Sequence, residues 1–376
     1  MMVTSINLLI VEDDDGQFET YSDMADELLR NNKCEFVLTR EKDATAAKQA
    51  LLSKDFDAAI VDLNLNANNP DEASGNEILI QIIETHRFPV FVVSGNLGKL
   101  NQEIIERESL FLKFYNRDKP NSEIFGEIQK IWNTGITKIL GGRGMIENKL
   151  TDIFWKHLAN DLDVWIQNNN ASEKALLRYA VSHLSEYLDQ PSVEDGYYYS
   201  DAEFYIKPPI QKVIATGDIA ENKDGSRFIV LSPACDVAVR GQDDSDNPII
   251  NAKRLTLAKL ITVDRQSFIE NNVIKVGDNT GSREKTLEKI IHGQQDKYIF
   301  LPEYKELKAS IADFQNLHTV EFNDYTINYK RIATVASPFL KDIQSRFSSY
   351  YGRQGQPDLN KKELVKKHKP KLSYNP

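Results

Sequence analysis

The strongest constraint on the fold is an alternation of two patterns along the first 120 residues. Short apolar runs rich in Val, Ile, Leu and Phe are separated by longer stretches with helical spacing. Strands that are apolar throughout are typical of a parallel sheet covered by helices on both faces. The apolar runs lie at residues 6–11, 36–40, 57–62, 89–95 and 110–114, and the helical stretches at 16–30, 43–53, 75–86 and 99–107. This alternation predicts a doubly wound α/β domain with a five-stranded parallel sheet.

The rest of the chain predicts two further parts. A fifth helix over 121–140 ends at the glycine-rich segment GGRG, which lacks the GxxxxGK[ST] pattern of a phosphate-binding loop and is interpreted as a hinge. Two amphipathic helices follow, and from about residue 200 short strand-like runs predict a β-rich part for which a barrel is one architecture. We therefore expect a doubly wound domain at 1–140, a helical pair at 141–192 and a β-rich α+β domain with a basic tail at 193–376.

Charge and composition narrow the class of protein. Residues 1–130 contain 24 acidic and 13 basic side chains, so the first domain accounts for the net charge of −10 and is unsuited to nucleic acid. The tail at 361–371 carries six lysines and one glutamate, which is typical of a solvated end. No run approaches the roughly 18 apolar residues of a membrane span. Cys34 and Cys235 are too far apart to suggest a disulfide framework or a zinc site, so a reducing cytoplasm is expected.

Acidic residues end two of the predicted strands. The first strand delivers Glu12 and Asp13, and the third delivers Asp62. Because the carboxyl ends of parallel strands meet at one edge of the sheet, these carboxylates are expected to converge. Converging carboxylates repel one another, and a hard divalent cation such as Mg²⁺, which prefers oxygen ligands, would relieve the repulsion. A strand-ending acid that merely caps a turn is the alternative for Asp62 taken alone.

Two further strands end in polar side chains, Ser94 after the fourth and Lys113 near the end of the fifth. The ordered set of acid pair, central aspartate, hydroxyl and lysine resembles the receiver domain of response regulators in two-component signalling. The resemblance covers roughly residues 5–135 and implies a flavodoxin-like fold.

The resemblance also implies roles for these residues. Asp62 would accept a phosphoryl group from a phosphohistidine of a histidine kinase or a related phosphodonor protein. Glu12 and Asp13 would hold Mg²⁺ together with Asp62 and the backbone carbonyl of Asn64. Lys113 would pair with the phosphoryl oxygens, and Ser94 would hydrogen-bond to them. Phosphoryl transfer depends mostly on positioning and charge neutralisation, which suits this set of residues. The family is one of bacterial signalling, and its phosphorylated form would act on an effector.

Several features depart from the receiver pattern. The loop after Asp62, LNLNANNPDEASGNE, places Gly75 about five residues late. Lys113 is followed by phenylalanine where receivers have proline, and the nearest Lys-Pro pair begins at Lys119. The aromatic residue that senses the hydroxyl is either Phe111 or Tyr115. A degenerate receiver that binds a partner without phosphorylation therefore stays an alternative.

The second half leaves the output open. The helices at 145–168 and 172–189 lack a basic recognition face, so DNA binding is not expected and a packing or homodimer-forming pair is the better interpretation. Cys235 would be a nucleophile only if His292 or His318 supplied a base, and a small buried hydrophobe is the alternative. We therefore expect an effector module that binds a partner protein, with a receiver-regulated enzyme as the competing hypothesis.

Overall fold

A computed structural model describes residues 5–31, 34–65, 74–142, 144–167, 173–188, 198–242, 248–353 and 359–372. The chain forms two compact units, residues 1–192 and 193–376, which are described separately. The three-part division expected from the sequence stays a prediction. Among the described residues, no helix is long and apolar enough to cross a membrane.

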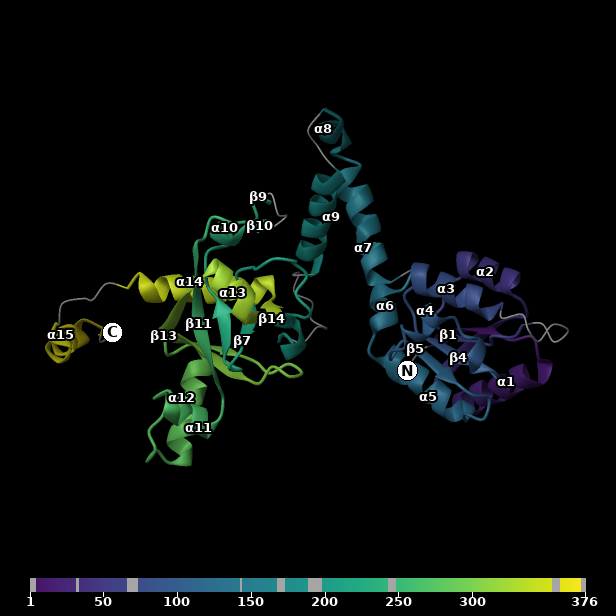
Figure 1. Ribbon diagram of the computed structural model, residues 1–376, viewed down its shortest axis with the longest axis horizontal. Coiled ribbons are helices and arrows are strands. Elements are labelled where there is room, and N and C mark those ends of the chain that lie inside the picture. Colours follow the sequence, from purple (N-terminus) through teal and green to yellow (C-terminus); the bar gives the residue numbers. More distant parts are fainter. Residues whose placement is uncertain are drawn as a thin grey trace. The chain divides into compact units, whose positions relative to one another are not determined.

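The first unit contains a five-stranded sheet in the order β2-β1-β3-β4-β5, with every pair parallel (Figure 1). The predicted doubly wound α/β fold is confirmed. Its strands are β1 (Ser5–Val11), β2 (Glu35–Glu41), β3 (Ala58–Val61), β4 (Val90–Val93) and β5 (Leu112–Tyr115). Its helices are α1 (Asp15–Arg30), α2 (Ala44–Ser53), α3 (Gly75–Thr85), the 3₁₀ turn η1 (Leu97–Lys99), α4 (Gln102–Ile105) and α5 (Asn121–Asn133).

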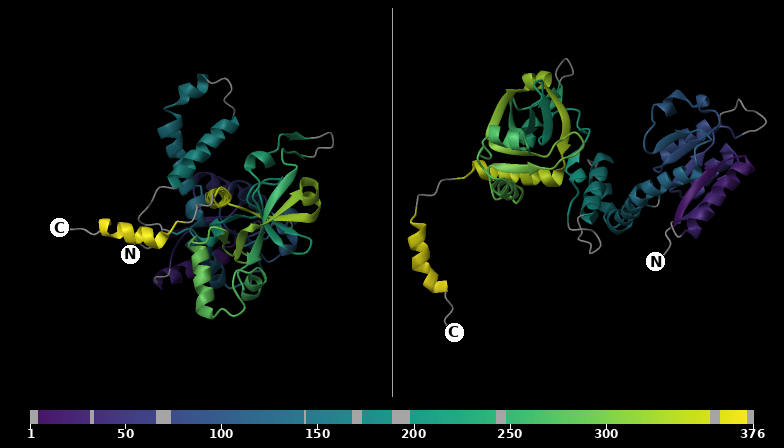
Figure 2. Two further views of the ribbon diagram at one scale, coloured as in Figure 1. Left: turned by 90° about the vertical axis from the view of Figure 1, so that its left-hand side faces the viewer. Right: turned by 90° about the horizontal axis from the view of Figure 1, so that it is seen from below.

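Alternating side chains along the strands build a core on each face of this sheet. Leu9, Val61 and Val92 pack with residues of α2 and α3, whereas Ile10 and Phe91 pack with residues of α1 and α5. All four residues of β3 and of β4 are buried. Strands covered on both faces need apolar side chains at every position, which explains the continuous apolar runs of the sequence. The helices flank the sheet on both sides (Figure 2).

The first unit continues beyond the sheet as a helical hairpin. A short helix packs against α5 and is followed by two longer segments that lie side by side, with a π-helical turn in the first (Figure 1). These elements are α6 (Ile136–Leu140), α7 (Met145–Ile153), the π-helical turn η2 (Phe154–Leu158), α8 (Leu162–Gln167) and α9 (Glu173–Leu188).

The second unit is built on a seven-stranded antiparallel sheet in the order β12-β13-β11-β8-β7-β14-β6. This sheet is strongly curved (Figure 2). Within the described residues β12 and β6 are not paired with each other, so the sheet does not close into a barrel. Its strands are β6 (Tyr205–Ile206), β7 (Asp218–Asn222), β8 (Arg227–Val230), β11 (Arg254–Thr262), β12 (Tyr298–Leu301), β13 (Ser310–Glu321) and β14 (Tyr329–Val335), and β9 (Gly241–Gln242) pairs separately with β10 (Pro248–Ile249).

Helices pack on apolar clusters of this sheet. Ile343 of α14 packs on one apolar cluster of the sheet, and Phe268 and Ile290 of α11 and α12 pack on another beside β12. The helices are η3 (Asp201–Glu203), α10 (Ala234–Val237), α11 (Arg265–Glu270), α12 (Thr280–Ile291), α13 (Phe322–Asn328), α14 (Ser337–Tyr351), α15 (Lys361–His368) and η4 (Lys369–Leu372). The predicted α+β character of this half is therefore confirmed.

Candidate metal centre

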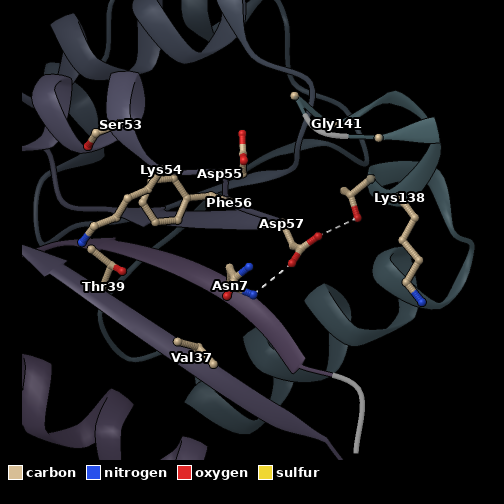
Figure 3. A pocket seen from close by; sticks show the side chains of 13 residues that line it. Asn7, Val37, Thr39, Ser53, Lys54, Asp55, Phe56, Asp57, Lys138 and Gly141 are labelled. Carbon is tan, nitrogen blue, oxygen red and sulfur yellow. Dashed lines mark hydrogen bonds between the residues drawn. The ribbon is translucent and has the colours of Figure 1, made fainter. Parts of the chain in front are cut away.

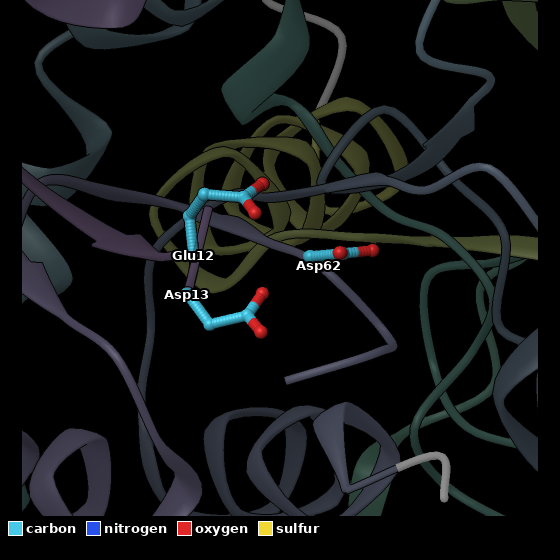
Figure 4. Close-up of side chains that lie close together, drawn as sticks. All are labelled: Glu12, Asp13 and Asp62. Atoms are coloured by element: carbon cyan, nitrogen blue, oxygen red, sulfur yellow. The ribbon is translucent and has the colours of Figure 1, made fainter. Parts of the chain in front are cut away.

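Three carboxylates meet where β1 and β3 end. The two strands are neighbours, and the ladder extends one step further because the Asp62 N–H donates to the Val11 carbonyl at 2.9 Å. Glu12 and Asp62 therefore leave the sheet side by side, and both are buried. Carboxylate oxygens of Glu12, Asp13 and Asp62 lie within 4.8 Å of one another (Figure 4). The convergence expected from the strand ends is present.

The neighbouring acids have structural roles. The Asp14 carboxylate accepts the Gln17 N–H at 2.7 Å and caps α1. Asp15 pairs with Arg40 and Lys42, and these two cations lower the pKa of its carboxyl. Arg40 also donates to the backbone carbonyls of Glu12 and Asp13, which fixes the loop that carries the candidate metal ligands.

Burial makes the charged form of Glu12 costly. It raises the pKa of this carboxyl to about 7, with the neighbouring Asp62 as the second cause, while Arg117 opposes the rise. A buried acid beside a second acid favours its neutral form until a cation offsets the charge.

Arg117 supplies a cation at this place. Its Nη2 lies 2.6 Å from Asp62 Oδ2 and 3.5 Å from Glu12 Oε1. It follows β5 by two residues and is 40% exposed at its side chain. Sequence analysis missed Arg117 because the receiver pattern has a lysine followed by proline near the end of the fifth strand. The available signal was a basic residue just beyond the fifth strand.

Lys113 points elsewhere. Its Nζ donates to Glu127 Oε2 at 2.5 Å, and the Tyr115 hydroxyl donates to the same oxygen at 2.8 Å. Lys119 pairs with Glu123 and lies over the Tyr115 ring. No hydrogen bond or ion pair found among the described residues joins either lysine to Asp62. The structure therefore does not bring Lys113 into the carboxylate site where the sequence placed it.

Ser94 and Gly75 complete the surroundings of Asp62. Ser94 follows β4, is buried, and donates its backbone N–H to the Tyr115 carbonyl. A Cβ on Gly75 would lie 2.3 Å from the Asp62 carbonyl oxygen, so only glycine fits where α3 begins. Asn64, the expected carbonyl ligand, is described two residues after Asp62, but most of the inserted loop, residues 66–73, lies outside the described residues. Phe111 is 44% exposed at the start of β5.

The residues present fit a divalent metal ion. Asp62 Oδ1 is buried and has no hydrogen-bond partner among the described residues, although its sister oxygen is bonded to Arg117. A buried carboxylate oxygen without a partner is costly, and a cation held by three oxygen donors would satisfy it. The donor set suits a hard cation that prefers oxygen ligands, such as Mg²⁺, rather than a metal that prefers sulfur or nitrogen.

The opposite edge of the sheet holds a cavity of about 540 Å³ beside the glycine-rich segment (Figure 3). Asp57 accepts the Asn7 N–H at 2.9 Å and the Thr137 hydroxyl at 3.1 Å. Cβ atoms on Gly141 and Gly144 would lie 2.3 and 2.5 Å from backbone carbonyl oxygens. Close packing of the turn between α6 and α7 therefore explains these two glycines without a bound phosphate.

Cys235 lies in the second unit, exposed at α10. Its Sγ is 3.7 Å from Asp236 Oδ1. His318 contacts Asn316 and the Phe228 ring, and His292 ends α12. No contact found in the described ranges joins Cys235 to either histidine, so the thiol–imidazole pair of the enzyme hypothesis is not assembled in them.

Comparisons with solved structures give similarities that cover the N-terminal third of the chain. No family model matches the chain, and no curated protein matches it. Among solved structures, a CheY-like receiver domain from Methylobacillus flagellatus is 22% identical, covers 34% of this chain and 99% of its own, and has a TM-score of 0.28. The phosphorylated cyanobacterial phytochrome response regulator RcpA is 18% identical, with 36% and 94% covered and a TM-score of 0.25. The response regulator TrrA from Thermotoga maritima, solved with Mg²⁺ and BeF, is 12% identical, with 34% and 98% covered and a TM-score of 0.26.

The chain's own topology defines the class of the first unit. The strand order 2-1-3-4-5 in a parallel sheet is that of flavodoxin and CheY. The carboxylates lie at the carboxyl ends of β1 and β3, which is where ligands bind in open α/β sheets. Residues 5–133 therefore have a receiver-like fold.

Proposed function

We propose that Asp62 accepts a phosphoryl group in a Mg²⁺-dependent reaction, and that this event controls a partner-binding module in the second unit. One observation carries the proposal. Asp62 is buried in a cluster of three carboxylates, of which Glu12 is also buried and Asp13 is partly buried; one Asp62 oxygen is bonded to a guanidinium and the other has no described partner. A solvated cap at a strand end would have neither the burial nor the neighbours.

Glu12, Asp13 and Asp62 would hold the metal ion. When bound, Mg²⁺ supplies positive charge that lets an anionic phosphodonor approach an anionic carboxylate. An Asp62 carboxylate oxygen would attack phosphorus and form the P–O bond of an acyl phosphate. The bond between phosphorus and the donor imidazole nitrogen would break, and the electron pair would leave with the imidazole. A histidine kinase or a related phosphodonor protein is therefore the proposed partner.

In this proposal Arg117 takes the role that was expected of Lys113. A guanidinium can bond two phosphoryl oxygens at once, whereas an ammonium acts as a point charge. Arg117 would move from Asp62 Oδ2 to the phosphoryl oxygens, and the buried Ser94 hydroxyl would donate to another. The added charge would then change the surroundings of β4 and β5.

A small-molecule phosphodonor tests the acceptor directly. The full chain with Mg²⁺ should take up about one phosphoryl group, and Asp62→Asn should take up none. Asp15→Asn is the matched control, because Asp15 belongs to the same acidic run but pairs with Arg40 and Lys42. An unlabelled wild type, or equal labelling of Asp62→Asn, would contradict the proposal.

A second experiment separates the two cations. Arg117→Ala should slow phosphorylation by about two orders of magnitude, because the loss of one charged donor to a transferring group is typically that large. Lys113→Ala should change the rate less than twofold, since its ammonium is engaged by Glu127. If the sensitivities are reversed, the assignment of Arg117 is wrong.

A receiver that works without phosphorylation is the second candidate, and the Arg117–Asp62 pair favours it. An ion pair already neutralises the acceptor at 2.6 Å, so a constitutive conformation could be held without a phosphoryl group. Absence of labelling together with loss of partner binding in Asp62→Ala would support this candidate. An enzymatic second unit and the absence of DNA binding stay predictions.

A further inference from the structure

We propose that the helical hairpin after the receiver-like domain is a dimerisation element, and that its partner is a second copy of this chain in parallel register along α9. This inference is independent of phosphorylation. It rests on which side chains of α9 face the other helix of the hairpin and which are left exposed.

The inner face of the hairpin is aromatic and polar. Tyr179, His183 and Tyr187 are spaced four residues apart on α9 and therefore lie on one helical face. The Tyr187 hydroxyl is 2.9 Å from His157 Nε2, the rings of His183 and His157 are 4.9 Å apart, and Lys149 lies over the Tyr187 ring. These contacts join α9 to α7 and η2, so the orientation of α9 within the hairpin is fixed.

The apolar stripe of α9 faces away from this contact. Leu177, Val181, Leu184 and Leu188 lie roughly a third of a turn from the inner face at 100° per residue. Leu177, Val181 and Leu188 are 63%, 57% and 66% exposed, and Leu184 is half-buried. The contacts of α9 with α7 and η2 therefore leave the apolar stripe of α9 largely exposed.

The spacing of this stripe identifies what covers it. Successive intervals of four, three and four residues are those of a coiled-coil seam, with Leu177 and Leu184 at d and Val181 and Leu188 at a. Val181, the β-branched one of the two a residues, together with leucine at both d positions favours two parallel strands. An irregular apolar patch on a foreign protein would not require this repeat, whereas a second α9 would match it at every layer.

Charge complementarity sets the same register. In this heptad frame Glu173 is a g residue and Arg178 is the e residue five positions later. In a parallel, in-register pair, a g residue lies beside the e residue of the following heptad on the other helix. Glu173 of each copy would therefore face Arg178 of the other, giving two ion pairs. An antiparallel pair would not place these residues together.

A stable dimer needs more apolar surface than the α9 stripe exposes, and the rest of the hairpin exposes further apolar side chains. The α9 stripe alone exposes too little, since a standard interface buries about 800 Å² on each partner. The other hairpin segments add Met145, Leu150, Phe154, Trp155, Leu162, Val164 and Ile166, each between 36% and 70% exposed. At roughly 100 Å² for each of these large exposed side chains, the hairpin exposes on the order of 1,000 Å² of apolar surface, distributed over its segments. Two hairpins would pack as a four-helix bundle.

Sedimentation velocity of the full chain at micromolar concentrations tests the proposal. The wild type should sediment with the mass of two chains. Val181→Glu should raise the dimer dissociation constant at least tenfold, while Ser182→Glu, one residue away and off the seam, should leave it within twofold. Because both positions are exposed, neither change should unfold the hairpin, which circular dichroism checks. A monomeric wild type, or a dimer equally stable in both variants, would overturn the proposal.

Two variants test the register. Glu173→Arg and Arg178→Glu should each weaken the dimer, and the double variant should restore it. In a Cys235→Ser background, Leu177→Cys should form an intermolecular disulfide under mild oxidation, because equivalent d residues face each other only in a parallel pair. A dimer that fails to crosslink through Leu177→Cys, or in which the charge exchange does not restore affinity, would refute the parallel seam.

Discussion

In the metal-free protein the buried Glu12 carboxyl should make the free energy of unfolding depend on pH. Replacing Glu12 by glutamine is expected to remove this pH dependence. Glu12 is buried and lies beside Asp62 and Asp13, with Arg117 as the nearest cation. Its carboxyl accepts the Asp14 N–H at 3.2 Å, which only partly compensates for burial. In the unfolded chain the same carboxyl is solvated and titrates near its ordinary value.

The magnitude follows from the difference in pKa between the two states. The pKa of Glu12 rises from 4.5 to about 7 on folding, so the folded state binds the proton more tightly. The resulting stabilisation is complete below pH 4.5 and is lost as the pH rises through 7. Between pH 5 and pH 8 this one group should lower the free energy of unfolding by about 2.5 kcal/mol, at 1.36 kcal/mol for each pKa unit. Saturating Mg²⁺ should offset the loss at the alkaline end by binding only the folded state.

Tryptophan fluorescence provides the assay. Trp132 is buried in the receiver-like core, whereas Trp155 and Trp165 lie in the hairpin. A Trp155→Phe, Trp165→Phe background lets Trp132 report urea unfolding of the first unit in the full chain with chelator present. Glu12→Gln should flatten the pH profile by the stated amount, and Glu19→Gln, an exposed acid on α1, should not. Identical slopes for wild type and Glu12→Gln would refute the reasoning.

Two further predictions concern packing and buried charge. Gly75→Ala should destabilise the first unit by about 2–4 kcal/mol, because the added Cβ would overlap the Asp62 carbonyl oxygen. Gly126→Ala is the control: this position lies in the middle of α5 with open space around it, and the change should stabilise the first unit by about 0.5–1 kcal/mol. Thermal unfolding distinguishes them, and equal effects would contradict the steric argument. Asp218→Ala should lower the free energy of unfolding of the second unit by about 3–5 kcal/mol, since Arg331 would lose both of its contacts with that carboxylate. Glu321→Ala should lower it by under about 1 kcal/mol, because the pair that Glu321 forms with Arg254 is exposed. A denaturant midpoint that moves equally in both variants would refute the distinction.

The sequence predicted the first unit well because its signals are local. Strands buried on both faces must be apolar throughout, and the helices between them must present one apolar stripe, so each element carries its own evidence. The same logic placed Glu12 and Asp62 together, since β1 and β3 need only be neighbours for their ends to meet. Fold class and carboxylate convergence thus required no knowledge of distant contacts.

The open sheet of the second unit could not be predicted in the same way. Its order brings β7 beside β14 and β11 beside β13, which are joined by long connections. Alternating apolar residues predict that a strand is half-buried, but they do not state which strand is its neighbour. Asp218 illustrates the limit, because its buried partner Arg331 is 113 residues away. A closed barrel and an open curved sheet require the same alternation of apolar and polar residues along their strands, so the sequence pattern does not distinguish them.

Strand pleat explains why Lys113 does not lie beside Asp62. On β5, Lys113 and Tyr115 lie two residues apart and therefore point to the same face, which is the face covered by α5. On that face Glu127 of α5 accepts a hydrogen bond from the Lys113 ammonium. A group that reaches Asp62 must instead leave from beyond the strand end, and Arg117 has both that position and the length. An arginine at this point also stays protonated at every pH that the protein meets, unlike the buried Glu12 beside it. The charge of the site therefore varies with the protonation of Glu12, while the charge of Arg117 stays constant.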